Sequence, residues 1–373
     1  MTERAQNVQG AEVCLPSKDV AADLAYYTEN LGFRLDTIFP ADDPAIAVLS
    51  GYGVRIRLER DTGVAPGVLR LSCRDPEAFA GGERDLTAPN GVRIQIVDSD
   101  PPLAKPRPHH AFVVQRLKDG TPRVIGRAGM HYRDLIPGRL GGAMIASHIR
   151  IPDAGPVPDM VHFHTVGFQL IFCYSGWVRL VYEDQGPPFV MGLGDCVVQP
   201  PRIRHRVIES SANLQVIEVS VPAEHVTTID HEMELPTPLL NPDREFGGQR
   251  FCLREAEPAV WKPWRLQGFE ARDTGIGAAT AGVASVQVAR VTGHAVGEVT
   301  SHTSDILFAF VLSGSVTLSA QGQGVHDLNE GDAYVIPPDL RTSLTNSSAK
   351  LQLLEVSLPA NFETRTYPSA HLP

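Results

Sequence analysis

The stretch Gly155–His205 decides the fold. It opens with GPVPDMVHFHTVGFQLIFCYSG from Gly155 to Gly176, and it closes with GDCVVQPPRIRH from Gly194 to His205. Glycine and proline mark turns between short runs of β-branched and aromatic residues, a pattern typical of a chain of short strands. The histidines lie inside this pattern at fixed spacings.

Four polar positions in this stretch predict a metal site. Alternate side chains of a strand share a face, so His162 and His164 project to the same side. Gln169 follows a short turn and opens the next strand, and His205 comes after the Pro-Pro turn. A closed barrel would bring all four inward. Three neutral imidazoles with one open side suit Zn, Fe, Ni, Mn or Cu.

The same spacings recur 137 to 139 residues later, which indicates an internal repeat. The turn residues are retained as Gly293, Gly314, Gly331 and Pro337, and the lead-in Arg133-Asp134 recurs as Arg272-Asp273. The four polar positions become Thr300, His302, Leu307 and Thr342. Because one histidine does not hold a metal tightly, we predict that the second copy is metal-free.

These motifs resemble those of the cupin superfamily, in which His-x-His, an acidic residue and a later His bind a metal. The resemblance implies a mainly β chain with two cupin-type β-barrels, a bicupin. Two positions depart from the family pattern: Gln169 stands where the family has Glu, and Arg202 where it has Gly. The metal ligands implied are His162, His164, Gln169 and His205. A neutral amide cannot take a proton as Glu can, so Gln169 weakens any mechanism that uses that carboxylate as a base.

The N-terminal residues predict a small α+β domain. Strands are expected at 11–15, 33–39, 45–50 and 54–59, with an amphipathic helix at 19–31, which is a βαβββ order. An abbreviated second module is expected over 68–97, with a turn or short helix at Asp75-Pro76 and a final strand led in by 89–92. The domain resembles the glyoxalase-like, or vicinal-oxygen-chelate, fold. Glu12 and Glu59 stand near that family's metal positions; we interpret them as solvated surface carboxylates.

The predicted boundaries follow changes in composition, above all the proline-rich stretch before residue 111. They are a glyoxalase-like domain at 8–98, a linker at 99–110, the metal-binding cupin 1 at 111–225, a connector at 226–266 and the degenerate cupin 2 at 267–365. The connector carries Phe251, Trp261 and Trp264, which we expect to pack between domains rather than to form a substrate lid.

Composition narrows the function. The chain has 373 residues and a net charge of −10, and no basic run that would indicate nucleic-acid binding. Its longest apolar run, Ile306–Leu312, is too short to cross a membrane, and the first ten residues contain no secretory signal. Five cysteines without a CxxC pair are typical of reduced thiols in a cytoplasmic protein. We therefore expect a small-molecule substrate, with neither nucleic acid nor membrane as a partner, and, from the cupin resemblance, a homodimer.

Strand alternation indicates what surrounds the metal. With Gln169 and His205 inward, Ile171, Cys173, Ile203 and Val207 also face inward and form an apolar wall. His148 and Arg150 share one face of the preceding strand. If that face is inward they are candidate catalytic residues, with Gln169, that orient substrate oxygens; if it is outward they are solvated.

The cupin resemblance implies a mononuclear metal enzyme. We predict a dioxygenase that acts on a small aromatic or enol/diketone-type compound, with one divalent metal, Fe(II) favoured over Zn, Ni, Mn or Cu. An isomerase or cyclase of secondary metabolism that does not use O2 is one alternative. A binding or sensing bicupin without catalysis is the other.

Overall fold

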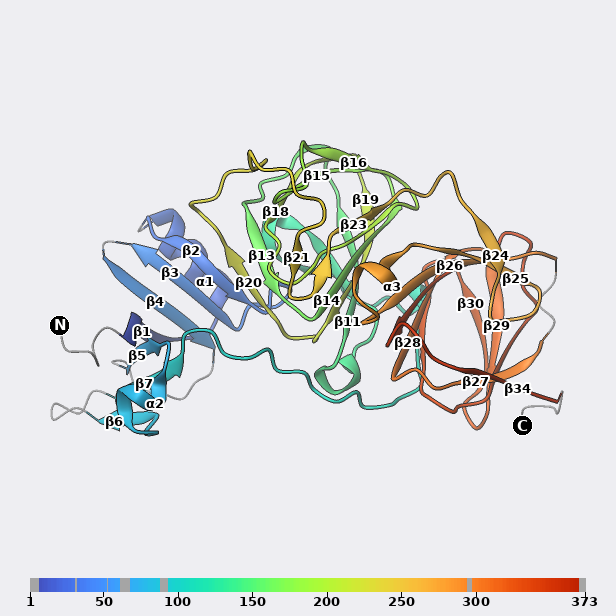
Figure 1. Cartoon of the computed structure of the whole chain (residues 1–373), viewed down its shortest axis with the longest axis horizontal. Coiled ribbons are helices and arrows are strands. Elements are labelled where there is room, and N and C mark those ends of the chain that lie inside the picture. The colour runs from blue at the N-terminus through green and yellow to red at the C-terminus, as the bar shows by residue number, and fades with distance from the viewer. Residues whose placement is uncertain are drawn as a thin grey trace. The chain divides into compact units, whose positions relative to one another are not determined.

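A computed structural model describes residues 7–30, 32–51, 53–60, 68–87, 93–293 and 297–368. The chain divides into two compact units. The first comprises residues 1–104 with 160–165 and 225–233, and the second comprises 105–159, 166–224 and 234–373. Figure 1 labels their helices and strands.

The first unit opens with the predicted βαβββ module. Its sheet runs in the order β2-β3-β4-β1, in which β1 is parallel to β4 and the other pairs are antiparallel. Asp19 caps the helix by accepting a hydrogen bond from the Ala22 amide, and the last turn becomes a π-helix. Leu31, where the helix was expected to end, lies outside the described residues. The elements are β1 (Val8–Ser17), α1 (Val20–Ala25), the π-helix η2 (Tyr26–Asn30), β2 (Arg34–Phe39), β3 (Ile46–Gly51) and β4 (Val54–Arg60).

A shorter module extends the same sheet. β5 pairs antiparallel with β1 and parallel with β7, and β6 pairs antiparallel with β7. The expected short helix is present, whereas residues 89–92, expected to lead into the last strand, lie outside the described residues. On the other side of the sheet, β20 pairs with β2, and β13 pairs with β20. These elements are β5 (Val68–Cys73), α2 (Pro76–Ala80), β6 (Asp85–Thr87), β7 (Arg93–Asp98), β13 (His162–Thr165) and β20 (Val226–Ile229).

The carboxylates Glu12 and Glu59 differ in burial. Glu12 is buried, with 8% of its surface exposed, and lies 3.5 Å from the Arg55 guanidinium. Glu59 is partly exposed and pairs with Arg57 at 3.1 Å. The interpretation of Glu12 as a solvated surface residue is therefore wrong, because the carboxylate is covered and paired with an arginine.

The second unit contains the second copy of the repeat and most of the first, whose residues 160–165 belong to the first unit. Figure 1 draws the strands of the first copy in green and those of the second in orange to red. In the first copy the strands are β9 (Val124–Ile125), β10 (His131–Asp134), β11 (Ile145–Ile151), β12 (Gly155–Pro156), β14 (Phe168–Ser175), β15 (Val178–Tyr182), β16 (Phe189–Met191), β17 (Cys196–Val198), β18 (His205–Ser210) and β19 (Leu214–Val221). In the second they are β24 (Trp261–Pro263), β25 (Phe269–Asp273), β26 (Ser285–Val291), β27 (Val299–His302), β28 (Ile306–Ser313), β29 (Ser315–Ala320), β30 (Gly324–Asn329), β31 (Ala333–Ile336), β32 (Thr342–Thr345), β33 (Gln352–Leu358) and β34 (Thr364–Tyr367).

Short elements connect these strands. They are β8 (Val113–Gln115), β21 (Glu245–Phe246), β22 (Gln249–Arg250), β23 (Cys252–Arg254), α3 (Ile276–Ala279) and the 3-10 turns at Leu117–Asp119, Arg127–Gly129 and Arg139–Gly142.

The two copies agree in detail. β14 pairs with β19 as β28 pairs with β33, and both pairs shift register at the same place, after Cys173 and after Val311. Gly176 and Gly314 have positive φ angles of 81° and 76°, and a Cβ atom at either would collide with a serine side chain, that of Ser211 or Ser348. The turn geometry explains why both glycines recur.

Three apolar clusters fill the second unit. One lies inside the first barrel and includes Cys173, Leu180 and Tyr182. A second lies inside the second barrel and includes Leu307 and Leu353. The third joins one sheet of each barrel, because residues of β14 and β19 pack with residues of β26, β28 and β33. The two barrels therefore share a core.

The lead-in segments of the two copies are exchanged. β8, which precedes the first copy, pairs with β31 of the second, whereas β23, which precedes the second copy, pairs with β17 of the first. Asp332 accepts a hydrogen bond from the Leu117 amide at 2.7 Å, and Asp195 accepts one from the Ala256 amide at 2.6 Å. Each Gly-Asp turn thus fixes the segment that leads into the other barrel.

The repeated arginines of the lead-in make the same exchange. Arg133 donates to the Gly331 carbonyl at 2.7 Å, and Arg272 donates to the Gly194 carbonyl at 2.9 Å. The segment predicted as a connector is part of this packing. Trp261 packs against the shared core, Phe251 against the interior of the first barrel, and Trp264 against that of the second.

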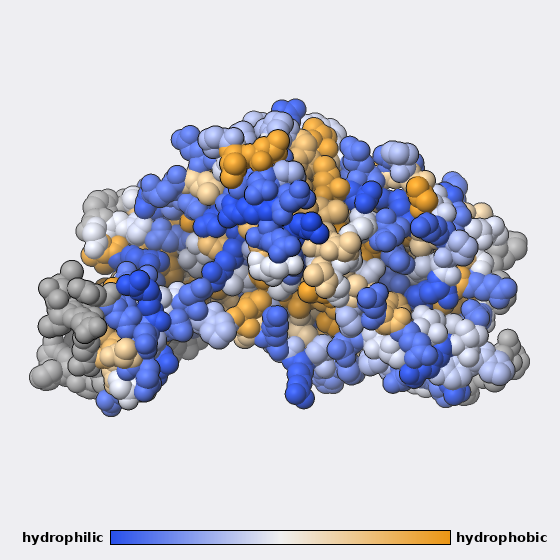
Figure 2. Space-filling view, viewed as in Figure 1, coloured by the Kyte–Doolittle hydropathy of each residue, from blue (hydrophilic) through white to orange (hydrophobic). Residues whose placement is uncertain are grey.

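Polar residues cover most of the face shown in Figure 2, and apolar residues appear on it in small areas. No helix among the described ranges is long and apolar enough to cross a bilayer. All five cysteines are free thiols.

Candidate metal centre

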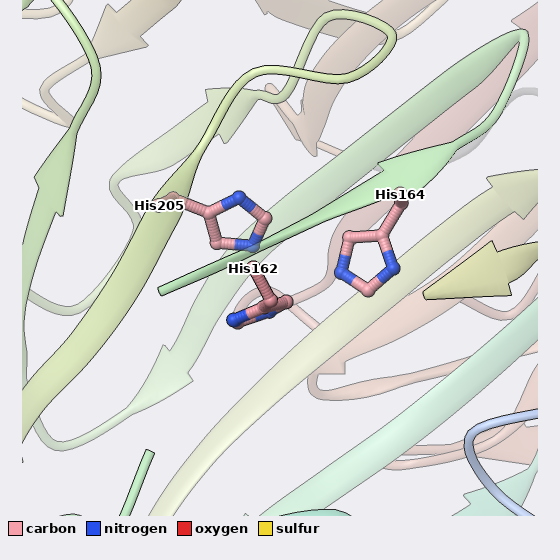
Figure 3. Close-up of side chains that lie close together, drawn as sticks. All are labelled: His162, His164 and His205. Carbon is pink, nitrogen blue, oxygen red and sulfur yellow. The ribbon is translucent and has the colours of Figure 1, made fainter. Parts of the chain in front are cut away.

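Three histidines converge in the first barrel. His162 and His164 belong to β13, and His205 begins β18. One ring nitrogen of each lies within 4.8 Å of the others, and all three side chains are buried. Figure 3 shows the three rings around a common space. The predicted spacing has therefore brought the three imidazoles together.

The outer nitrogen of each ring is held by a hydrogen bond. Nδ1 of His162 lies 2.8 Å from the Met160 carbonyl, and Nδ1 of His205 lies 3.0 Å from the Ile203 carbonyl. Nδ1 of His164 lies 2.9 Å from the Thr227 hydroxyl. A carbonyl accepts, so His162 and His205 carry their proton on Nδ1 and present the lone pair of Nε2 inward. Such hydrogen bonds orient metal-binding histidines.

The surroundings keep His205 neutral. Burial lowers the pKa of His205 from 6.5 to about 4. Its ring stacks on Tyr182, with centroids 5.4 Å apart, and Tyr182 in turn contacts Phe251 at 4.5 Å. A neutral imidazole can bind a metal at neutral pH, whereas an imidazolium cannot.

Gln169 lies on the inner face of the same barrel. It is 1% exposed on β14, and it shares a face with Ile171 and Cys173, which pack with Tyr182 inside the barrel. Its Nε2 donates to Glu218 Oε1 at 2.8 Å, and its Oε1 has no hydrogen-bond partner among the described residues. A buried oxygen without a partner is uncommon and fits a position beside a bound ligand.

The apolar wall predicted around the site is present. Ile171, Cys173, Ile203 and Val207 all belong to the interior cluster of the first barrel. An apolar wall beside polar donors is the usual composition of a small-molecule site.

Two charged residues close to His205 were not predicted. Arg127 forms an ion pair with Asp159, whose side chain is fully buried. Asp159 also accepts a hydrogen bond from the Val207 amide at 2.9 Å. Burial works against the charged form of Arg127, but Asp159 outweighs it and raises the pKa of the guanidinium.

His148 and Arg150 face away from this interior. His148 pairs across the sheet with Ile217, which belongs to the core shared by the two barrels, and its ring contacts Phe310 and Tyr174. Its Nδ1 lies 3.2 Å from Arg133, and its Nε2 donates to Gln215 at 2.7 Å. Arg150, on the same face, donates to Asn213. The sequence did not determine which face of this strand points into the barrel. In the structure His148 and Arg150 lie on the outer face, so neither residue is placed to orient a substrate at the histidines.

His148 lines a different space. A cavity of about 730 Å³ lies in the second unit, and residues of both copies line it, including His148, Tyr174, Trp261 and Arg290. Burial lowers the pKa of His148 to about 3.

The second barrel holds an ion pair where the first holds its polar site. Arg265 pairs with Glu355 inside this barrel, and both side chains are largely buried. Nε2 of His302 lies 3.1 Å from the Ile336 carbonyl. Thr300 pairs directly with Thr342 across the strands. Burial, together with the Arg265 charge, lowers the pKa of His302 to about 4.

Glu218 and Arg127 were missed because they stand outside the spaced motifs. A comparison of the two copies contains a signal for both. Arg127 and Arg265 are 138 residues apart, and Glu218 and Glu355 are 137 apart, within the repeat offset. Charged residues retained in both copies outside the turn motifs would have marked them as interior groups.

Comparisons with known proteins indicate the fold. No family model matches the chain, and no curated protein sequence matches it. Among solved structures, a salicylate 1,2-dioxygenase variant from Pseudoaminobacter salicylatoxidans in complex with gentisate is 16% identical, with a TM-score of 0.52 over 70% of this chain and 87% of that one. The formate complex of Lactobacillus farciminis oxalate decarboxylase is 13% identical, with a TM-score of 0.51 over 70% and 91%. With the internal repeat and the two barrels, these likenesses show that the chain has a mainly β bicupin fold.

Proposed function

We propose that the first barrel binds one divalent metal ion through His162, His164 and His205, with Gln169 as a neutral fourth ligand. The observation that carries the proposal is the convergence of three ring nitrogens within 4.8 Å, with each Nδ1 held by a hydrogen bond. Three histidines that leave positions open are typical of catalytic metal sites. The partnerless Oε1 of Gln169 is consistent with a ligand there.

We further propose that the protein is a dioxygenase that acts on a small aromatic or enol/diketone-type compound, with Fe(II) as the metal. Such a metal would supply a Lewis acid for an enolate or catecholate oxygen and a site for O2. The residues of the chain have simpler roles. The apolar wall of Ile171, Ile203 and Val207 would pack against the substrate and exclude water. Two solved structures of similar fold are salicylate 1,2-dioxygenase variants in complex with gentisate, an aromatic compound of this kind.

The metal proposal is tested by a matched pair of substitutions. His164→Ala removes one ligand, and His302→Ala removes the histidine at the equivalent position of the second barrel. We expect the first variant to lose its bound metal and the second to retain it, as measured by elemental analysis after reconstitution with Fe(II). Equal metal content in wild type and His164→Ala would overturn the proposed ligand set.

The oxygenase proposal is tested by oxygen uptake. The Fe(II)-loaded protein should consume O2 in the presence of a dihydroxybenzoate or a 1,3-diketone, and His164→Ala should not. A loaded protein that consumes no O2 with any enol or phenol would exclude the dioxygenase.

A second candidate is an isomerase or cyclase that does not use O2. The observation in its favour is Glu218, a carboxylate inside the barrel at 2.8 Å from Gln169. A carboxylate in that place could move a proton, which Gln169 cannot. Conversion of an enol substrate without O2 by the metal-loaded protein would favour this function over the dioxygenase.

A further inference from the structure

We infer that Glu218 is a positioning residue, which orients the Gln169 amide so that its oxygen, and not its nitrogen, faces the metal. The inference rests on the proposed metal site and adds to it a residue outside the four ligand positions. It follows from the hydrogen bonds of one amide and from a comparison of the two barrels.

The first step is the chemistry of the amide. A carboxamide has one end that accepts hydrogen bonds or binds a metal and one end that only donates. An ionised carboxylate only accepts, so Glu218 must receive the NH2 end of Gln169, at 2.8 Å. The opposite end, Oε1, is then fixed away from Glu218, and it is the atom that has no partner among the described residues. Without Glu218 either end could turn toward the metal.

The second step is what holds Glu218. On the sheet, Glu218 is directly opposite Ile171, whose neighbour two positions earlier is Gln169, and all three face the barrel interior. Ser220 donates to the same oxygen, Glu218 Oε1, at 3.2 Å. Two donors therefore converge on this oxygen, and they hold the carboxylate beside the amide.

The third step is the second barrel, which serves as an internal comparison. There Leu307 replaces Gln169, and the equivalent carboxylate, Glu355, pairs with Arg265. In the first barrel the equivalent arginine, Arg127, pairs with Asp159, and the charge of Glu218 also contributes to the raised pKa of its guanidinium. The residue at the position of Asp159 in the second copy is Gly297, which has no carboxylate.

In the first barrel Arg127 forms an ion pair with Asp159, and Glu218 accepts a hydrogen bond from Gln169. The pair of Gln169 and Glu218 occurs only in the copy with three histidines. A hydrogen bond to a carboxylate also draws negative charge onto the amide oxygen, which strengthens it as a ligand.

The test measures Co(II) binding to the full-length protein by competition with a chelating dye, together with the visible absorption of the bound ion. Loss of a hydrogen bond of this kind typically weakens metal binding by about 10- to 100-fold. We expect Glu218→Ala and Gln169→Ala to weaken Co(II) binding to a similar extent and to give the same altered spectrum. The double variant should bind no more weakly than Gln169→Ala alone.

Additive losses in the double variant, or an unchanged spectrum in Glu218→Ala, would overturn the inference. Wild-type protein that binds no Co(II) would instead overturn the proposed metal site, so the two failures are distinguishable. Glu355→Ala is the matched control: it removes the equivalent carboxylate and should leave Co(II) binding and its spectrum unchanged.

If Glu218→Ala does not fold, as judged by circular dichroism, Glu218→Gln replaces it. This variant keeps the volume and one acceptor but loses the charge that fixes the amide. It should shift the Co(II) spectrum and weaken binding less than Gln169→Ala does. Binding and a spectrum identical to those of wild type would contradict the positioning role.

Discussion

At the scale of single residues, one pair of equivalent carboxylates has two different partners. Glu218 accepts from a neutral amide, whereas Glu355 pairs with a guanidinium. A buried carboxylate needs compensation, and either partner supplies it. Two positions near this pair differ between the copies: the first has Gln169 and Asp159 where the second has Leu307 and Gly297.

The ion pair of the second barrel leads to a prediction about stability. Arg265→Leu would leave Glu355, whose side chain is 5% exposed, without its cation. Breaking a buried pair from one side costs about 3–5 kcal/mol of unfolding free energy. Urea unfolding should show this loss for Arg265→Leu and a much smaller one for the double variant Arg265→Leu/Glu355→Leu. A double variant as unstable as the single one would contradict it.

The residues of the site were predictable to different degrees. His162, His164 and His205 follow from spacing, because strand alternation and turn position determine where their side chains point. The face of His148 did not follow, since most of its strand is buried on both sides and alternation does not show which side is the barrel interior. The geometry shows that its outer face meets the second barrel.

At the scale of elements, the exchanged strands are the main feature. β8 and β23 have three residues each. β8 precedes the first copy but extends a sheet of the second barrel, and β23 precedes the second copy but extends a sheet of the first. The sequence predicted two barrels because the turns repeat. It did not predict the exchange, because a three-residue strand has too little pattern to identify its partner.

The Gly-Asp turn is predicted to hold the exchanged strand. Asp332 accepts hydrogen bonds from the amides of Leu117 and Asn329 and is 2% exposed. Asp332→Ala leaves both amides without their acceptor. For each amide, the free energy of unfolding should fall by at most about 1–3 kcal/mol. Hydrogen exchange should become faster at the β8 amides. Asp327→Ala, at an exposed position bonded to Thr317, is the control and should leave β8 protected.

At the scale of the whole second unit, the shared core makes stability depend on pH. Burial is the largest cause that lowers the pKa of His148 from 6.5 to about 3, and the arginine charges of Arg133 and Arg123 add to it. The unfolded chain therefore binds one more proton than the folded chain between these pH values. Neutral His148 therefore makes its full contribution to the free energy of unfolding above pH 6.5. As the pH falls from 6.5 toward 3, this contribution decreases by at most about 1.4 kcal/mol per pH unit.

His148→Phe tests this pH dependence. Phenylalanine keeps the ring packing against Phe310 and Tyr174 but cannot take a proton. It should lower the melting temperature at pH 7, because Gln215 loses its donor. It should also flatten the fall in melting temperature between pH 7 and pH 4. An equally steep fall in both proteins would assign the acid sensitivity to other groups.

The reciprocal pairing of β8 with β31 and of β23 with β17 also limits what the chain can lose over evolutionary time. The second copy has one of the three histidines of the first. Its deletion together with β23 would expose the edge of β17 in the first copy, and an uncovered edge invites aggregation. The copy with one histidine therefore supplies, through β23, part of a sheet of the copy with three.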